Sequence, residues 1–422
     1  MFTSTVRHVA QRRARGSVQR RGNAWLVRVS AGTDPVTGKR LWLCGTRESQ
    51  KEAEKLRTKL LGQVDEKKAS RTRASLGALL EEWLPGAELS ATTRDNYAGL
   101  IDRFIRPALG ALPLTRLTPP GIERFYGELR RCRARCDGRP FLEHRRPGEH
   151  DCAQAQCRPH ECRPLAASSV LVLHAILSGA LEAALRWEWV SVNPARAARR
   201  PKPPPPHPDP PTPEQAGRLI TAAWAQDETW GTLVWLVMTT GMRRGEALAL
   251  RWRHVHLDRQ VLEIRRSYIQ RRGRKIEKDT KTHQMRRIAL DPDTTTVLAE
   301  HRDRARQRAT LLGVATIDEW YLFSNDPAHS QPLHPDWVTH RYTAMAAEVG
   351  ITTHLHALRH YSATELLAAG VYLATVSGRL GHGGGGATTL RVYAAWVAAS
   401  DQRAAEVLGA KMPKRPRTVR ST

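Results

Sequence analysis

Residues 378–396 read GRLGHGGGGATTLRVYAAW, and this stretch raises the question of what its tyrosine does. Tyr393 follows His382 by eleven residues, and four consecutive glycines, 383–386, lie between them. A buried tyrosine needs no glycine run in front of it. Because glycine leaves the backbone unusually free, the run predicts a flexible joint that lets Tyr393 swing towards a reacting atom.

The charge balance of the 422-residue chain indicates the kind of partner. There are 67 Lys and Arg against 41 Asp and Glu, a net charge of +26. Such an excess favours a polyanion, nucleic acid first and an anionic membrane surface second. No apolar run approaches the roughly 20 residues of a membrane span, and residues 1–16 lack the apolar centre of a signal peptide. We therefore expect a soluble, cytoplasmic protein that binds DNA and no membrane.

Composition shifts divide the chain into parts. Residues 1–70 contain two strands, around 25–29 and 40–44, and a helix opened by a capping box at Ser49 and Glu52. Residues 75–200 have helical periodicity, interrupted at 131–164, and the proline-rich residues 201–211 form a stiff linker. A mixed region at 212–410 and a basic tail at 411–422 follow. The fold class is therefore multi-domain α+β: a small β-sheet plus helix, a helical bundle, and a mixed, mainly helical domain with a small β-sheet.

Three more basic stretches accompany the opening one in the mixed region. They read TTGMRRGEALALRW (239–252), KDTKTHQMRRIAL (278–290) and HLHALRHYSATELLAAG (354–370). Singly, each is typical of a solvated amphipathic helix or of surface histidines. Taken together and in this order, they resemble the boxes of the tyrosine recombinases, the phage-integrase family, in particular integrases of actinobacterial phage or plasmid type.

The resemblance implies a catalytic set, with one residue or pair from each stretch. These residues are Arg243, Lys281, His356, Arg359, His382 and Tyr393. It also implies an arm-type DNA-binding domain at 1–70, a core-binding domain at 75–200 and a catalytic domain at 212–410. Its further implications are double-stranded attachment sites, a homotetramer on DNA, and an excisionase or host DNA-bending protein as an accessory factor.

The chemistry of strand cleavage accounts for these residue types. Attack on a phosphodiester builds negative charge on the non-bridging oxygens. The guanidinium groups of Arg243 and Arg359 can stabilise this charge at any working pH, because they stay protonated. A tyrosine with a pKa near ~10 needs activation, and His356 is suited to accept its proton. The family assigns protonation of the leaving 5′ oxygen to Lys281, and His382 would donate a hydrogen bond to the phosphate. The product is a 3′-phosphotyrosyl link, and no metal or nucleotide cofactor is expected for catalysis.

Some alternatives stay open at this point. The interval from His382 to Tyr393 is one residue longer than the family spacing, which the glycines can absorb. Tyr361 and Tyr372 are rival nucleophiles, although both are more simply explained by packing. The alternative functions are a type IB topoisomerase-like enzyme and a catalytically silent DNA-binding regulator.

Two further groups of residues carry predictions. The N-terminal sheet is interpreted as a DNA-contacting surface rather than a plain hairpin domain because of five basic residues: Arg20, Arg21, Arg28, Lys39 and Arg40. The interruption at 131–164 is rich in cysteine and histidine and is compatible with one tetrahedral structural zinc, although an exposed basic loop with reduced thiols is equally consistent. The candidate ligands are Cys132, Cys136, Cys152, Cys157 and Cys162, with His150 or His160 as substitutes and His144 nearby.

Overall fold

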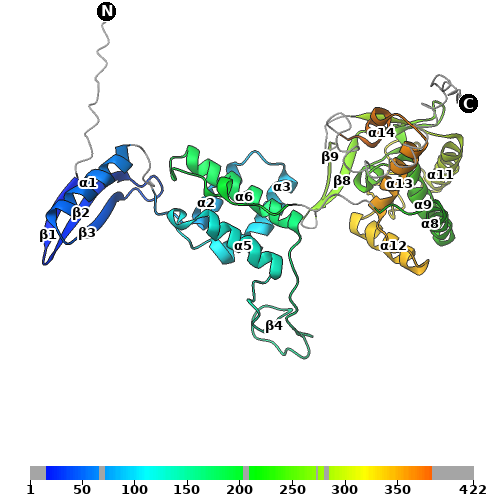
Figure 1. Ribbon diagram of the computed structural model, residues 1–422. Helices are drawn as coiled ribbons and strands as arrows, with labels where there is room; N and C mark the ends of the chain where they lie inside the picture. Colours follow the sequence, from blue (N-terminus) through cyan, green and yellow to red (C-terminus); the bar gives the residue numbers. More distant parts are fainter. Residues whose placement is uncertain (1–15, 66–71, 203–208, 272–273, 280–284, 383–422) are drawn as a thin grey trace, which may run out of the picture. The chain divides into compact units, whose positions relative to one another are not determined.

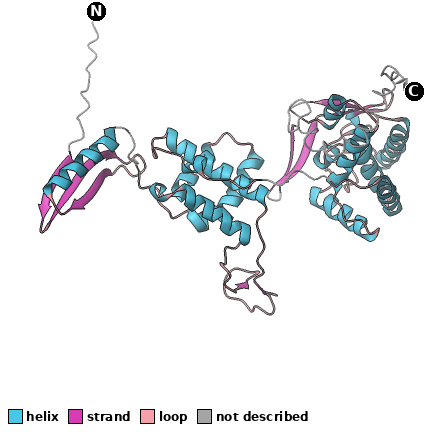
Figure 2. Cartoon of the chain, viewed as in Figure 1, coloured by secondary structure: helices cyan, strands magenta, loops and turns pink. Residues whose placement is uncertain are grey.

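The computed structural model describes residues 16–65, 72–202, 209–271, 274–279 and 285–382. The chain divides into two compact units, Met1–Pro204 and Pro205–Thr422, and the division falls within the segment predicted as a linker (Figure 1). A small sheet and a helical bundle belong to the first unit, and a mainly helical domain with short strands forms the second (Figure 2).

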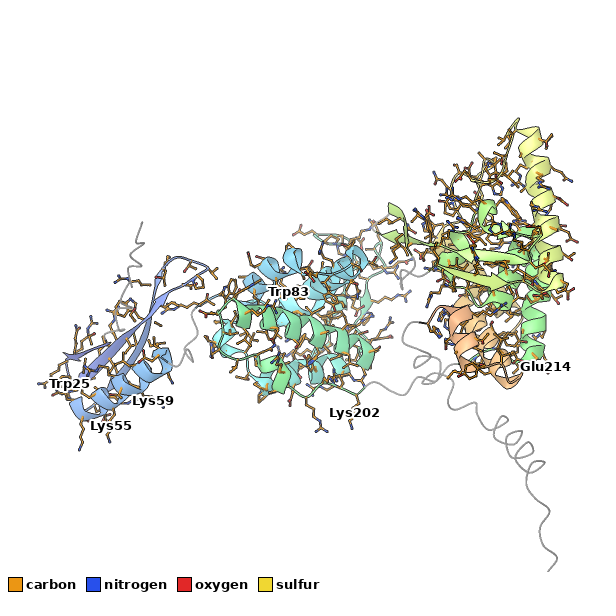
Figure 3. All side chains as sticks on the ribbon, turned by 90° about the horizontal axis from the view of Figure 1, so that it is seen from above. Trp25, Lys55, Lys59, Trp83, Lys202 and Glu214 are labelled. Atoms are coloured by element: carbon orange, nitrogen blue, oxygen red, sulfur yellow. The ribbon has the colours of Figure 1, made fainter. Side chains whose placement is uncertain are left out.

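The N-terminal sheet has three antiparallel strands, one more than the sequence predicts: β1 (Gly16–Arg21), β2 (Ala24–Thr33) and β3 (Arg40–Arg47). The helix α1 (Gln50–Asp65) follows, and the Oγ of Ser49 accepts from the N–H of Glu52 at its start. Val27 and Val29 are fully buried with Ala53 of α1, so the helix covers one face of the sheet. Lys55 and Lys59 are exposed on the outer side of α1 (Figure 3).

The helical bundle has one continuous apolar core, in which Leu76, Phe125 and Leu173 are buried. Thr118 caps the helix Pro119–Arg131 by accepting from Gly121 N–H, as the Thr-Pro start predicts. The elements are α2 (Leu76–Gly86), α3 (Ala91–Leu100), a π-helical turn (Ile101–Ile105), α4 (Arg106–Leu109), a 3₁₀ turn (Leu114–Arg116), α5 (Pro119–Arg131), α6 (Ala167–Arg186) and α7 (Pro194–Ala197).

Helix α6 corrects one expectation from the sequence. By length and composition it is apolar enough to cross a bilayer. It is the central helix of the bundle, however, and Val170, Leu177 and Leu181 on it are fully buried in the core. The same composition serves a core helix and a membrane span, so this one helix is weak evidence for a membrane.

The insertion between α5 and α6 has very little regular structure. It contains a short antiparallel ladder of β4 (Leu142–Glu143) and β5 (Arg158–Pro159). All of residues 133–164 are described, and none of them is buried. Apolar packing therefore does not explain how this segment keeps its shape.

The first helix of the second unit begins at a reciprocal capping box formed by Thr212 and Gln215. Its core surrounds α9 and includes Trp230, Phe323 and Tyr342. The helices are α8 (Pro213–Gln226), α9 (Glu228–Thr240), α10 (Arg244–Leu248), α11 (Pro292–Leu311), α12 (Pro335–Glu348), α13 (Leu355–Ala368) and α14 (Leu373–Leu380), with a 3₁₀ turn (Trp252–His254). A three-stranded antiparallel sheet orders β10 (Arg286–Ala289), β7 (Val261–Ile264) and β6 (Val255–His256), and β8 (Arg266–Arg271) pairs with β9 (Arg274–Asp279).

Candidate active site

Four of the six residues predicted as catalytic lie at or near the ends of helices. Arg243 lies in the short connection between α9 and α10, and His356 and Arg359 lie in the first turns of α13. His382 follows the end of α14. Three segments that are distant in sequence therefore supply one site.

Arg359 joins two of these helix ends. Its side chain is 2% exposed, and its guanidinium donates to the carbonyl of Gly241 at 2.5 Å and to that of Leu380 at 2.6 Å. These carbonyls belong to the C-terminal ends of α9 and α14, where backbone acceptors lack a helical partner. Arg359 thus fixes the position of α14, and of His382 after it, relative to α9.

Arg243 is held from two sides. Its Nη2 donates to the carbonyl of Gly381 at 3.0 Å, and its Nη1 lies 2.8 Å from Oε1 of Glu246. The backbone N–H of Arg243 also donates to Oε2 of Glu246, at 2.8 Å. The side chain keeps 28% of its surface exposed, so Arg243 is less enclosed than Arg359.

Glu246 is a functional residue that the sequence analysis missed. Its side chain is 1% exposed, and it pairs with Arg286 of β10 as well as with Arg243, at 2.6 Å between Oε2 and Nη2 of Arg286. Burial opposes ionisation, yet hydrogen bonding and charge from Arg286 and then Arg243 lower the pKa of Glu246 to about 2. A glutamate three residues after the arginine was the available signal, but the sequence did not show that it is buried.

Two glycines make the close approach of these helix ends possible. Gly241 and Gly381 end α9 and α14 in the left-handed conformation, at φ 65° and 66°. A Cβ on Gly381 would lie 2.8 Å from Nη1 of Arg286, and one on Gly241 would lie 2.5 Å from a methyl of Leu380. A side chain at either position would therefore push the arginines and His382 apart.

The histidines of the site are neutral at physiological pH. His356 keeps an exposed edge, but the protein around it removes part of its hydration, and this desolvation, then the charges of His360 and Arg359, lowers the pKa of His356 to about 4. Burial, then Arg359 and Arg243, lowers the pKa of His382 to about 4. A neutral imidazole can accept a proton at one nitrogen and donate a hydrogen bond from the other. Both abilities match the roles predicted for this pair.

Two of the six predicted catalytic residues, Lys281 and Tyr393, lie outside the described residues. The rival tyrosines differ from each other. Tyr361 is partly buried against the core of the unit, as expected for packing. Tyr372 is 76% exposed, so its interpretation as a packing residue was wrong: its position at the N-cap of α14 leaves the ring in solvent.

The five basic residues predicted for the N-terminal sheet are all exposed, but they do not share one face. Side chains alternate along a strand, and the pairing register places Arg21, Arg28 and Arg40 on the face opposite α1. Arg28 stacks there over Trp42 at 4.7 Å. Arg20 points to the side of α1, and Lys39 lies in the turn before β3.

The cysteines and histidines of the insertion come together as two groups rather than one. Each group offers four atoms that lie within 4.8 Å of one another. The first group is Cys132, Cys136, His160 and Cys162, and the second is His144, His150, Cys152 and Cys157.

Comparisons with known proteins agree with this fold. Residues 212–399 match the family model described as the phage integrase family. The chain is 22% identical to the ICEBs1 integrase of Bacillus subtilis over 372 residues, which are 87% of this chain and 92% of that protein. It is 24% identical to the integrase of Mycobacterium phage D29, over 81% of this chain and 79% of that one. The fold is that of the Tn1549 transposon integrase in complex with a circular intermediate DNA, with a TM-score of 0.61 and 16% identity over 79% of this chain and 99% of that chain.

A mixed, mainly helical domain thus brings two arginines and two histidines to neighbouring helix ends. Residues 212–399 form a domain of the phage integrase family, and the protein is a tyrosine-type site-specific DNA recombinase.

Proposed function

We propose that this recombinase integrates a mobile element into DNA, and excises it, through a 3′-phosphotyrosyl intermediate formed on Tyr393. The observation that carries the proposal is the convergence of Arg243, His356, Arg359 and His382 at neighbouring helix ends. The N-terminus of α13, a 14-residue helix, adds backbone N–H groups and a positive dipole end on the same side.

The reaction assigns each group one task. The phenol oxygen of Tyr393 attacks the phosphorus, the bond to the 5′ oxygen breaks, and the enzyme stays joined to the 3′ phosphate. Neutral His356 accepts the phenol proton, and Lys281 gives a proton to the departing 5′ oxygen. Arg243 and Arg359 stabilise the charge on the non-bridging oxygens, to which His382 donates a hydrogen bond. Attack by the 5′ hydroxyl of a second strand reverses these steps and completes the exchange.

We infer that the partners are two double-stranded attachment sites held by four copies of the chain. The relative solved in complex with a circular intermediate DNA supports DNA as the substrate. The separate N-terminal sheet supports a second class of DNA site, and an excisionase or a host DNA-bending protein would set the direction. The reaction takes place where the chromosome lies, in the cytoplasm. We also propose that any metal is structural, because the proton transfers above need only side chains of this chain.

A nicked suicide substrate tests this function. The binding site is first located by footprinting DNA that flanks the encoding gene, and a nick is then placed beside the cleavage point so that the cleaved fragment diffuses away. Wild-type protein should become joined to DNA and run as a slower band on a denaturing gel. A silent regulator would bind the site and form no such band.

Offering a second duplex separates the two remaining enzyme classes. A recombinase should transfer the trapped strand to the 5′ hydroxyl of a partner site. A topoisomerase-like enzyme would instead relax supercoiled plasmid of any sequence and would not join two sites. Relaxation without exchange would overturn the proposal.

A further inference from the structure

We propose that the insertion at 131–164 is a two-metal zinc module, with a Cys3His site and a Cys2His2 site. The segment contains five cysteines and three histidines, and all eight belong to one of the two four-residue groups. Cys132, Cys136, His160 and Cys162 form the outer site. His144, His150, Cys152 and Cys157 form the inner site, whose ligands all lie between the two halves of the outer site in sequence.

The spacing of the ligand atoms fits tetrahedral zinc. Zn–S bonds of about 2.3 Å and Zn–N bonds of about 2.0 Å separate neighbouring ligand atoms by about 3.3–3.8 Å. In the inner site, Nδ1 of His144 and Nε2 of His150 are 3.3 Å apart, and Sγ of Cys152 lies 3.6 Å from Nδ1 of His144.

The outer site has similar spacing. Sγ of Cys132 lies 3.2 Å from Nε2 of His160, and the Sγ atoms of Cys136 and Cys162 are 3.3 Å apart. The last distance is far beyond the about 2.05 Å of a disulfide. The thiols are thus free, and they converge on a point instead of pairing.

Two of the three histidines, His150 and His160, are oriented as metal ligands are. His160 turns Nε2 to the outer site, while its Nδ1 lies 2.7 Å from a carboxylate oxygen of Glu143. His150 turns Nε2 to the inner site, while its Nδ1 lies 2.8 Å from the carbonyl of Gly148. A carboxylate or a carbonyl on the far nitrogen fixes the tautomer and the ring direction of a zinc-bound histidine. Phe141 stacks on His160, at 4.3 Å between ring centroids, and holds its plane.

The short β4–β5 ladder connects the two sites. Glu143 of β4, which supports the outer site, precedes His144 of the inner site. On the other strand, Cys157 of the inner site precedes β5, and His160 of the outer site follows it. Each strand of the ladder therefore runs from one site to the other.

Bound metal would also explain what stabilises the insertion at 131–164. No residue of 133–164 is buried, all of them being described, so the module has no apolar core of its own. Segments of this size without a core are held by disulfides or metals, and thiolate with imidazole in tetrahedral arrangement selects zinc. The outer site begins at the buried Cys132, directly after α5, so its zinc fixes the module to the bundle.

The test is the metal content of the full-length chain, purified without chelators and without DNA. Elemental analysis should find two zinc ions per chain. In the native protein only Cys44, the exposed cysteine of β3, should react at once with a thiol reagent, and all six thiols should react after metal release. One zinc ion or none, or fast reaction of several thiols in the native protein, would overturn the proposal.

Paired serine variants assign the ligands. Cys136→Ser with Cys162→Ser should remove one zinc from the outer site, and Cys152→Ser with Cys157→Ser should remove one from the inner site. Cys44→Ser is the matched control and should keep both ions. A pair that releases both ions or neither would overturn the division into two sites. The Tyr393→Phe variant should also carry two zinc ions, so failure of the recombination chemistry would not affect this result.

Discussion

We call Arg243 and Arg359, the two arginines proposed to stabilise charge on the phosphate, the cation clamp. At the scale of a single residue Arg243 tests this proposal, because its side chain is partly exposed while its neighbours fix it. Arg243→Ala should slow cleavage by at least ~100-fold, the scale seen when one preorganised charge donor is removed. Arg243→Lys should recover only part of the rate, since a point charge cannot reproduce the planar fork. The measurement is single-turnover cleavage of the suicide substrate, with gel shift to confirm that binding persists.

Arg244 offers a matched control for this experiment. It is the next residue in the chain, but its guanidinium donates to the carbonyl of Pro335 on α12 and takes no part in the clamp. Arg244→Lys should cleave within a few-fold of wild type. Equal losses at Arg243 and Arg244 would mean that general basicity, and not a specific clamp, supports cleavage.

Glu246 allows a prediction about stability and positioning together. Glu246→Gln removes the charge that holds Arg243 and the largely buried Arg286, and breaking a buried pair typically costs about 3–5 kcal/mol of unfolding free energy. Cleavage should fall because Arg243 loses its orientation, whereas the pH dependence of the remaining activity should stay unchanged. Denaturant unfolding and single-turnover cleavage measure the two effects.

Glu263 is the control carboxylate for that variant. It also pairs with two arginines, Arg265 and Arg287, but their side chains are 46% and 78% exposed. The Glu263 side chain is itself only 11% exposed, but solvent screens pairs whose partners are this exposed, so Glu263→Gln should destabilise the protein less than Glu246→Gln. If Glu246→Gln were as stable as Glu263→Gln, the argument that Glu246 holds Arg243 and Arg286 by buried ion pairs would be wrong.

At this scale the sequence singled out the residues that we propose to face the substrate, and not those that hold them. The order of the basic boxes singled out Arg243 and His356, because reactive residue types stand out in short motifs. Glu246 and Arg286 were missed, since a carboxylate near an arginine looks the same in sequence whether it is buried or solvated. Their roles depend on the ion pair between Glu246 of α10 and Arg286 of β10, which lie 40 positions apart in the sequence.

The N-terminal sheet yields a prediction at the scale of an element. Replacing Arg21, Arg28 and Arg40 by alanine should weaken binding to full-length sites, because fewer phosphates are neutralised. The salt dependence of binding should fall by roughly 0.9 for each phosphate that the protein no longer neutralises. Cleavage of a short core site should be unaffected. Titration at several salt concentrations, by fluorescence anisotropy, gives the slope.

Lys55 and Lys59 supply the control, since they lie on the outer side of α1 (Figure 3). Replacing both by alanine changes the net charge similarly but leaves the open face of the sheet intact. If this pair lowers the salt slope as much per residue as the three arginines do, the sheet has no preferred DNA-binding face.

Elements with clear end signals were predicted well, and those without them were missed. The caps at Thr118 and Thr212 mark the starts of α5 and α8, because a side-chain oxygen must satisfy the first free N–H groups. Strand β1 was missed because it reads GSVQRR, with one apolar residue and no alternation to detect. Its pairing with β2 depends on the turn at Gly22, which has φ 59°.

Histidines that lose hydration on folding make the stability of the whole molecule depend on pH. Burial is the first cause that lowers the pKa of three of them to about 4: the buried His254 and His301 and the partly buried His382. An unfolded histidine titrates near ~6.5, so between these values the unfolded chain binds more protons and stability rises with pH. The contribution is complete above the unfolded pKa and is lost as pH falls towards 4.

The expected result is a melting temperature that is steady at and above pH 7 and falls steadily from about pH 6.5 to pH 4. Glu246 adds to this fall only at its acid end, because its pKa of about 2 keeps the folded carboxyl ionised while the unfolded one takes up a proton near pH ~4.3. Differential scanning calorimetry of the full chain at constant ionic strength measures the change. A melting temperature independent of pH in this window would contradict the burial of neutral histidines.

At the scale of the whole molecule, composition indicated a polyanionic partner and a proline-rich boundary, but not the two four-residue groups of the insertion. Net charge and the proline run are properties that the chain shows without folding. The arrangement of the insertion is different, because its ligands interleave: His160 and Cys162 return past the inner site to join Cys132. Spacing alone favoured one site, since no pattern of intervals reveals which cysteines meet after the chain turns back.

The central claim is that Tyr393 forms the covalent bond with DNA, and mass spectrometry of the trapped complex tests it most directly. The protein–DNA adduct from the suicide substrate is digested with protease and nuclease, and the peptide that carries the nucleotide is sequenced. The account predicts a 3′-phosphonucleotide on Tyr393 and no adduct from the Tyr393→Phe variant under the same conditions. A modified peptide containing Tyr361 or Tyr372, or an adduct that survives in Tyr393→Phe, would contradict the account.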